Sequence, residues 1–158
     1  MKNTDLSSPS LYINRELSHL QFNIRVLDQS LNTQHPLLER LAFLCIFSSN
    51  LDEFFEVRVA NLKQQLIFKR EKAGPDGIYA KDILRNIRNE VAQTVERQYK
   101  ILNEQILPEL QEQNIRFLRR TDWNEKQQKW IQDYFEERIQ PVISPIGLDP
   151  SHPFPRLV

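Results

Sequence analysis

The sequence is poor in glycine and cysteine, and this scarcity excludes several kinds of site. Gly74, Gly77 and Gly147 are the only glycines among 158 residues. Their spacing forms neither the GxGxxG loop of dinucleotide-binding folds nor the GxxxxGK[ST] loop that holds phosphates. The single cysteine, Cys45, excludes an intramolecular disulfide and a metal site built from several cysteines. Because Cys45 lies in the apolar run 41–47, we expect a buried, inert thiol.

The chain also lacks an excess of charge and a long apolar run. Lys plus Arg and Asp plus Glu each number 21, so the formal net charge is zero. Proteins that bind nucleic acid usually carry a basic excess, and we therefore expect no nucleic-acid partner. The longest apolar run, 41–47, is far shorter than the roughly 20 residues of a membrane-spanning helix. With no hydrophobic signal segment in residues 1–10, these features predict a cytoplasmic protein.

Apolar residues recur at helical spacing along most of the chain. Ser18–Gln21 has the form of a capping box, flanked by Leu17 and Phe22 as a hydrophobic staple, and predicts a first helix that ends near Leu31. Pro36 suits the first position of a second helix, 36–47. This segment is apolar nearly all round, which predicts the buried centre of a bundle.

Three residues that favour caps over helix interiors, Ser48–Asn50, predict a break after the second helix. A third helix follows and ends before the loop Gly74–Gly77, and a long fourth segment covers 80–113 with a kink or restart at Pro108. Residues 115–118 form a connector or an isolated strand, and a cap at 122–125 opens a last helix. The expected inner faces comprise Leu51, Phe55, Val59, Leu62 and Leu66; Ile83, Ile87, Val91, Val95, Tyr99, Leu102, Ile106 and Leu110; and Trp130, Ile131, Tyr134 and Phe135.

The predicted fold is therefore an all-α helical bundle of about five helices with an extended, proline-rich carboxyl-terminal arm. We divide the chain into a flexible amino terminus, 1–11, a helical domain, 12–140, and a segment, 141–158, that begins a linker or strand into a further domain. The last segment is assigned as a linker or strand because it contains five prolines between Pro141 and Pro155.

Few residues favour chemistry over structure. His19, His35 and His152 lie far apart in no metal-binding spacing, so local structure accounts for them and no metal site is expected. The carboxylates Asp52, Glu53 and Glu56 either bind a cation or complement a helix dipole, and the second interpretation is favoured. The basic residues of the third helix either bind a polyanion or form a solvated face, and the solvated face is favoured. They are Arg58, Lys63, Lys69, Arg70 and Lys72.

The break Ser48–Asn50 is harder to assign to structure alone. It ends the segment expected to be most buried, and its amide and hydroxyl groups, with free N–H groups of the next helix, suit a planar polar ligand. From the residues alone, a capping role for Asn50 and a ligand contact both stay open.

Three stretches in order resemble the opening of bacterial polyphosphate kinases of the histidine-phosphorylated class. These are YINRELS with FN and RVL, 12–27; PLLERL running into SNLDEFF and VR, 36–58; and PVISP with LDPSHPFP, 141–155. The resemblance covers about residues 12 to 158, and SNLDEFF is its most specific part.

The resemblance implies an enzyme that transfers the terminal phosphate of ATP reversibly to polyphosphate, through a phosphohistidine and with Mg²⁺. It places the catalytic histidine in later domains, so it implies no catalytic residue here and an inert fragment. Asn50 matches a contact to the adenine end of ATP, with Ser49 and Glu53 as weaker candidates by proximity. The implied partners are ATP or ADP, polyphosphate, the downstream domains and a second copy of the longer enzyme. That enzyme is cytoplasmic, with peripheral membrane association left open.

A different class of function stays open beside this one. A helical interaction or dimerisation module would pack on partner domains and contact no ligand. An exposed apolar patch away from Asn50 would favour it.

Overall fold

The computed structural model describes residues 5–69, 72–148, 151 and 153–154. The chain forms two compact units, Met1–Arg116 and Phe117–Val158, and each is described by itself. The described residues are helices joined by turns and loops with no β-strand, which confirms the all-α class and excludes a strand at 115–118.

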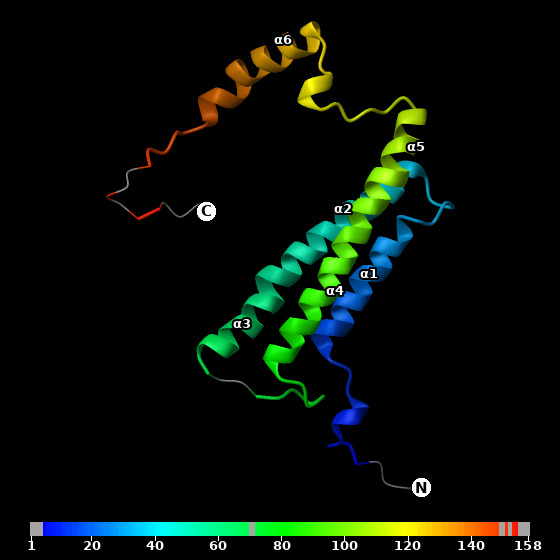
Figure 1. Cartoon of the computed structure of the whole chain (residues 1–158), viewed down its shortest axis with the longest axis vertical. Helices are drawn as coiled ribbons and strands as arrows, with labels where there is room; N and C mark the ends of the chain where they lie inside the picture. The colour runs from blue at the N-terminus through cyan, green and yellow to red at the C-terminus, as the bar shows by residue number, and fades with distance from the viewer. Residues whose placement is uncertain (1–4, 70–71, 149–150, 152, 155–158) are drawn as a thin grey trace. The chain divides into compact units, whose positions relative to one another are not determined.

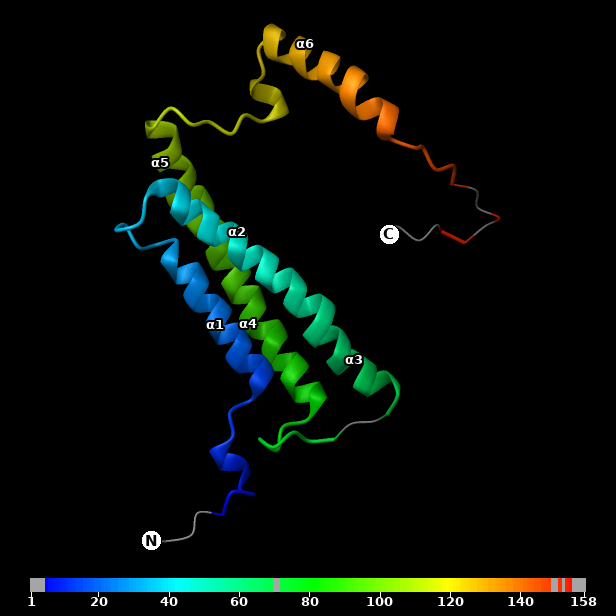
Figure 2. The same ribbon diagram turned by 180° about the vertical axis from the view of Figure 1, so that it is seen from behind.

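The first unit consists of three helical rods that lie side by side (Figures 1 and 2). The short 3₁₀ turn η1 (Pro9–Leu11) precedes the first rod, α1. α1 packs against α2 and α4, and α3 packs against α4. The rods are α1 (Arg15–Gln29); α2 (Leu37–Glu53), η2 (Phe54–Val59) and α3 (Ala60–Ile67); and α4 (Ala80–Ile101), η3 (Leu102–Ile106) and α5 (Leu107–Glu112).

The second unit contributes one further rod. The 3₁₀ turn η4 (Arg120–Asp122) leads to α6 (Glu125–Tyr134), which Asn124 caps reciprocally with Gln127. The π turn η5 (Phe135–Ile139) and the 3₁₀ turn η6 (Gln140–Val142) follow, so the predicted extended arm begins with a helical turn at Pro141. Residues 143–148 have no regular structure, and the predictions that involve Arg70, Pro150, His152 and Pro155 concern residues outside the described ranges.

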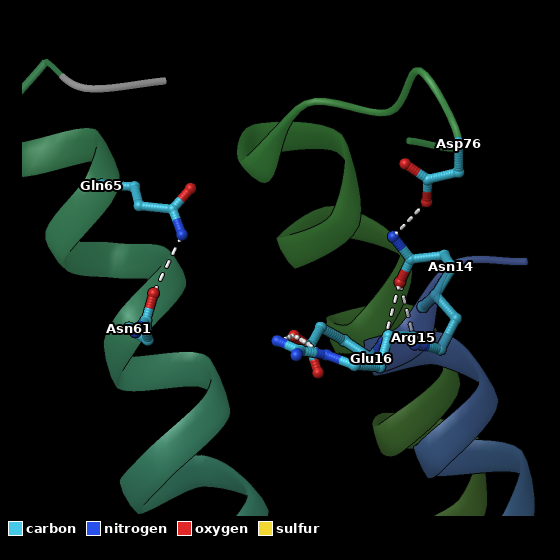
Figure 3. Close-up of polar contacts among 7 residues, drawn as sticks. Asn14, Arg15, Glu16, Asn61, Gln65 and Asp76 are labelled. Carbon is cyan, nitrogen blue, oxygen red and sulfur yellow. Dashed lines mark hydrogen bonds and ion pairs between the residues drawn. The ribbon is translucent and has the colours of Figure 1, made fainter. Parts of the chain in front are cut away.

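Asn14 caps the first helix, and the predicted cap at Ser18 was wrong (Figure 3). The Asn14 side-chain oxygen accepts from the backbone N–H groups of Glu16 and Leu17 at 3.1 and 3.0 Å. The Asn14 amide nitrogen also donates to the Asp76 carboxylate at 2.6 Å, which fixes the loop before α4 against the start of α1. Arg15 and Glu16 are good helix formers and extend the helix towards the amino terminus. Ser18 therefore lies within the helix, where its side chain is exposed.

The predicted break at Ser48–Asn50 was also wrong, because the second rod continues through it. Ser48 accepts a hydrogen bond from Gln98 of α4 at 2.7 Å, and Asn50 donates to Asn23 of α1 at 3.1 Å. These side chains therefore satisfy their polar groups on neighbouring rods and do not compete for their own backbone. The second and third predicted helices are one rod, so the described residues form four long rods, three in the first unit and one in the second, and not about five.

Two π-helical turns shift the buried face within the long rods. Across η2 the buried apolar face passes from Phe54 directly to Val59, five positions further on. It makes the same step from Ile101 to Ile106 across η3. A π turn contains one residue more than an α turn, which rotates everything beyond it. The extra residue of η2 leaves the expected inner residue Phe55 exposed. Tyr99, which precedes η3, is also exposed, whereas most of the other expected core positions of the first unit are buried or half-buried.

The π turn η3 lies directly before Pro108, where a kink or restart was predicted. Leu107 donates its N–H to Leu102, five residues back, and Pro108 then falls in the first turn of α5. A proline is tolerated in a first turn because its missing N–H has no helical partner there. The rod therefore passes through the proline by changing its hydrogen-bond pattern.

Two faces that were expected to be buried are open. In α2, Leu38 and Cys45 are exposed, so the prediction that this helix is buried on most sides and encloses the thiol was wrong. In the second unit, Trp130, Tyr134 and Phe135 are exposed, with Trp130 at 65%, although helical spacing predicted an inward stripe. Spacing reports that residues share a face, and it does not report what covers that face.

Candidate adenine-contact site

A pocket of about 180 Å³ lies between α1 and the second rod of the first unit. Sites that enclose a whole small molecule usually measure roughly 300–1,000 Å³, so this pocket suits one part of a nucleotide, such as its base. The lining residues are His19, Phe22, Asn50, Glu53, Phe54, Val57 and Arg58.

Asn50, the principal candidate from the sequence, lies in this pocket with a defined hydrogen bond. Its amide nitrogen donates to the side-chain oxygen of Asn23, which is only 2% exposed. Among the described residues, the Asn50 oxygen and its second N–H have no protein partner. One acceptor and one donor are therefore free at the pocket, and this pair matches the polar edge of a nucleobase.

The other two candidate residues, Glu53 and Ser49, differ in whether they line the pocket. Glu53, one helical turn after Asn50, lines the pocket. Ser49 is exposed and is not among the lining residues. Successive residues of a helix point about 100° apart, which separates Ser48, Ser49 and Asn50 onto three faces of one rod. The free N–H groups expected after a helix break are absent here, because the helix between the described residues 37 and 67 is continuous.

Aromatic rings form the apolar part of the lining. The His19 ring stacks on the buried Phe54 ring with centroids 5.6 Å apart and an angle of 15°. Phe22 is 54% exposed at the same pocket, and the Arg25 guanidinium lies 5.6 Å from its centroid. An exposed aromatic face can stack on any nucleobase, because every base has a flat π-face. His19 and Phe22 were missed by sequence reasoning, which interpreted the first as structural and the second as part of a staple.

The π turn η2 supplies three of the lining residues, Phe54, Val57 and Arg58. Such turns occur often at functional sites, because the extra residue changes which side chains face a neighbour. The sequence carries no trace of this turn, since Leu51, Phe55 and Val59 keep a regular four-residue step and only burial shows that Phe54 and Val59 face inward.

The charges at the pocket are balanced. Glu53 contributes one carboxylate and Arg58 one guanidinium. The remaining carboxylates of the predicted cluster, Asp52 and Glu56, are exposed, and the helix-dipole interpretation fails because no helix starts there. Among the described residues, no group of three or more His, Cys, Asp or Glu side chains is placed to hold a metal ion. A neutral, partly apolar pocket suits a base better than a triphosphate.

The remaining sequence candidates lie elsewhere. His35 contacts the Phe43 ring at 5.2 Å and lies within hydrogen-bond distance of Gln29. Lys63 and Lys69 are exposed, so of the described basic candidates only Arg58 reaches the pocket. No helix within the described ranges is long and apolar enough to cross a membrane.

Comparison with known proteins identifies the family. The sequence model of the polyphosphate kinase N-terminal domain matches residues 12–118, and that of the polyphosphate kinase middle domain matches residues 126–158. The chain belongs to the polyphosphate kinase family. The predicted resemblance is thereby confirmed over almost the whole sequence.

Individual polyphosphate kinases are close in sequence. That of Pseudomonas putida is 60% identical over 153 residues, which cover 97% of this chain and 21% of the relative. That of Pseudomonas aeruginosa is 58% identical over 153 residues, or 97% of this chain and 22% of the relative. The chain thus spans about a fifth of the length of these polyphosphate kinases.

The fold is similar to that of a solved polyphosphate kinase. The crystal structure of the enzyme from Porphyromonas gingivalis matches with a TM-score of 0.66 and 35% identity, over 82% of this chain and 18% of the other. The helical bundle is therefore the fold of this part of the family.

Proposed function

We propose that this chain is part of an enzyme that transfers the terminal phosphate of ATP reversibly to polyphosphate, and that its first unit forms the adenine side of the ATP site. The observation that carries this assignment is the position of Asn50 in the pocket, with a free donor and acceptor beside exposed aromatic rings. The family membership supports the reaction, since the matched relatives are polyphosphate kinases.

Each part of the pocket has a role in this proposal. Asn50 pairs with the polar edge of adenine, and the exposed face of Phe22 supports the plane of the ring. The pocket is too small for a whole nucleotide, so the ribose and phosphates extend beyond it. The downstream domains of the longer enzyme then supply the rest of the site, and its assembly as a homo-oligomer and its cytoplasmic location belong to the same proposal.

The chemical step lies outside the described residues. His19 stacks on Phe54 and His35 contacts Phe43, and neither is assigned the role of phosphate carrier. The described residues also provide no ligand cluster for Mg²⁺, and we assign none of them to it. We expect the chain alone to bind the base weakly and to transfer no phosphate.

Competition between fragments of ATP tests the adenine assignment. Saturation-transfer NMR of the chain with ATP should give stronger signals from the adenine protons than from the ribose. Excess adenosine should displace ATP, and inorganic triphosphate should not. If triphosphate displaces ATP and adenosine does not, the chain binds phosphates and the adenine assignment is wrong.

A second function has an observation of its own in its favour. A largely apolar groove of about 320 Å³ lies between α2 and α4, on a different face of α2 from the Asn50 pocket. It is lined by Leu41, Leu44, Cys45, Ser48, Gln98, Tyr99 and Leu102. Such a groove is what an interaction module would present to a protein partner. If the chain self-associates in sedimentation equilibrium and Leu41→Lys restores the monomer, while ATP fails to bind, this function replaces the first.

A further inference from the structure

Asn23 is the buried partner of Asn50 and has no contact with the pocket itself. It lies on the inner side of α1 and is 2% exposed, which is unusual for an asparagine. Both ends of its amide are bonded. Its nitrogen donates to the backbone carbonyl of Phe47 at 3.1 Å, and its oxygen accepts from Asn50 at 3.1 Å.

The direction of this chain of hydrogen bonds is fixed at the Phe47 end. A backbone carbonyl only accepts, so the Asn23 nitrogen must face Phe47 and the Asn23 oxygen must face Asn50. Asn50 must then turn its own nitrogen towards Asn23. The carbonyl of Phe47 can accept this bond in addition to its helical one, because it has two lone pairs.

We propose that Asn23 is a positioning residue that holds the Asn50 amide in one orientation and thereby sets which base the pocket accepts. This inference rests on the proposed function and deepens it. With Asn50 held by Asn23, one N–H and the carbonyl oxygen face the pocket in a fixed order. An amide in fixed order pairs with the adjacent donor and acceptor of adenine, as asparagine does with adenine N6 and N7. A flipped amide would set donor against donor on the same edge.

Replacing Asn23 by leucine removes the acceptor and keeps the branched shape and the number of side-chain heavy atoms. In Asn23→Leu, we expect ATP to bind about three- to tenfold more weakly, because the Asn50 side chain must be ordered on binding. The preference for ATP over GTP should fall as well, because the donor and acceptor can exchange places. A purely structural role of Asn23 would leave that preference unchanged.

The matched control is Thr94→Val. Thr94 is buried in α4, donates to the carbonyl of Glu90 in its own helix, and does not line the pocket. This variant should lose stability but keep the ATP affinity and the ATP-to-GTP ratio. Asn23→Ala serves in place of Asn23→Leu if the leucine variant does not fold, as judged by circular dichroism.

The decisive measurements are made by NMR on the ¹⁵N-labelled chain. In the free wild type, the side-chain NH₂ of Asn50 should be rigid, with one proton hydrogen-bonded, and in Asn23→Leu it should become mobile. ATP titrations should show that Asn23→Leu adds nothing to Asn50→Ala in the double variant. An Asn50 amide that stays rigid in Asn23→Leu, an unchanged ATP-to-GTP ratio, or additive losses would each overturn the inference. If wild type binds no ATP, the proposed function fails, and the mobility of the Asn50 amide alone decides whether Asn23 positions it.

Discussion

Arg40 of α2 holds the carboxylate of Glu109 in α5 with both terminal nitrogens, at 2.5 and 3.1 Å. The Arg40 side chain is almost fully buried, whereas that of Glu109 is 42% exposed. The Nε atom of Arg40 also donates to the carbonyl of Ser30, directly after α1, at 2.8 Å. One guanidinium group therefore joins all three rods of the first unit near one end of the bundle.

Removal of Glu109 should destabilise the chain strongly. In Glu109→Ala the buried guanidinium loses its counter-ion, and such a loss typically costs about 3–5 kcal/mol. The matched control is Asp28→Ala, since the Asp28–Arg97 pair also joins two rods but both side chains are over 40% exposed. That exposed pair should contribute about 1 kcal/mol or less. Urea unfolding followed by circular dichroism measures both, and equal losses would contradict the role given to Arg40.

The start of α1 gives a second contrast. Asn14→Ala removes the cap of α1 and its bond to Asp76, so it should lower the free energy of unfolding by about 1–2 kcal/mol. Ser18→Ala should change it by less than about 0.5 kcal/mol, because Ser18 is exposed inside the helix. Thermal unfolding of the two variants distinguishes the observed cap from the one that the Ser-x-x-Gln pattern predicted. A larger loss in Ser18→Ala would show that the helix starts later.

Apolar spacing predicted the helical class and most of the core because periodicity reports which residues share a face. It did not predict continuity at Ser48–Asn50, where the polar partners Gln98 and Asn23 lie 50 and 27 residues away in the sequence. Local propensity favours a cap there, and tertiary hydrogen bonds override it.

The candidate site was predicted only in part. Asn50 came from a resemblance to the family, whereas the sequence gives no sign that Asn23 is buried beneath it. His19 and Phe22 reach the pocket from α1, and their positions depend on how α1 packs against the second rod. The exposure of Trp130 was likewise unpredictable, because a regular apolar stripe looks the same whether it is covered or open.

The π turn η3 can be tested by deletion. Removing Gln105, an exposed residue of η3, would reduce the step from Ile101 to Ile106 from five to four and restore a regular helix. We expect this variant to fold and to unfold cooperatively. Removing Gln93, an exposed residue within α4, should rotate every later side chain of the rod by about 100° and abolish cooperative unfolding. If the Gln93 deletion proves the more stable of the two, the π turn is not where the extra residue is accommodated.

The most direct test of the adenine site is a ¹H–¹⁵N titration of the labelled chain with ATP, repeated on Asn50→Ala. The pocket holds only the base, so we expect millimolar affinity. Shifts should concentrate at residues 19–23 and 48–58, and they should disappear in Asn50→Ala while the rest of the spectrum, and hence the fold, is unchanged. Shifts of equal size in Asn50→Ala, or shifts confined to other parts of the chain, would contradict the assignment of the adenine contact to Asn50.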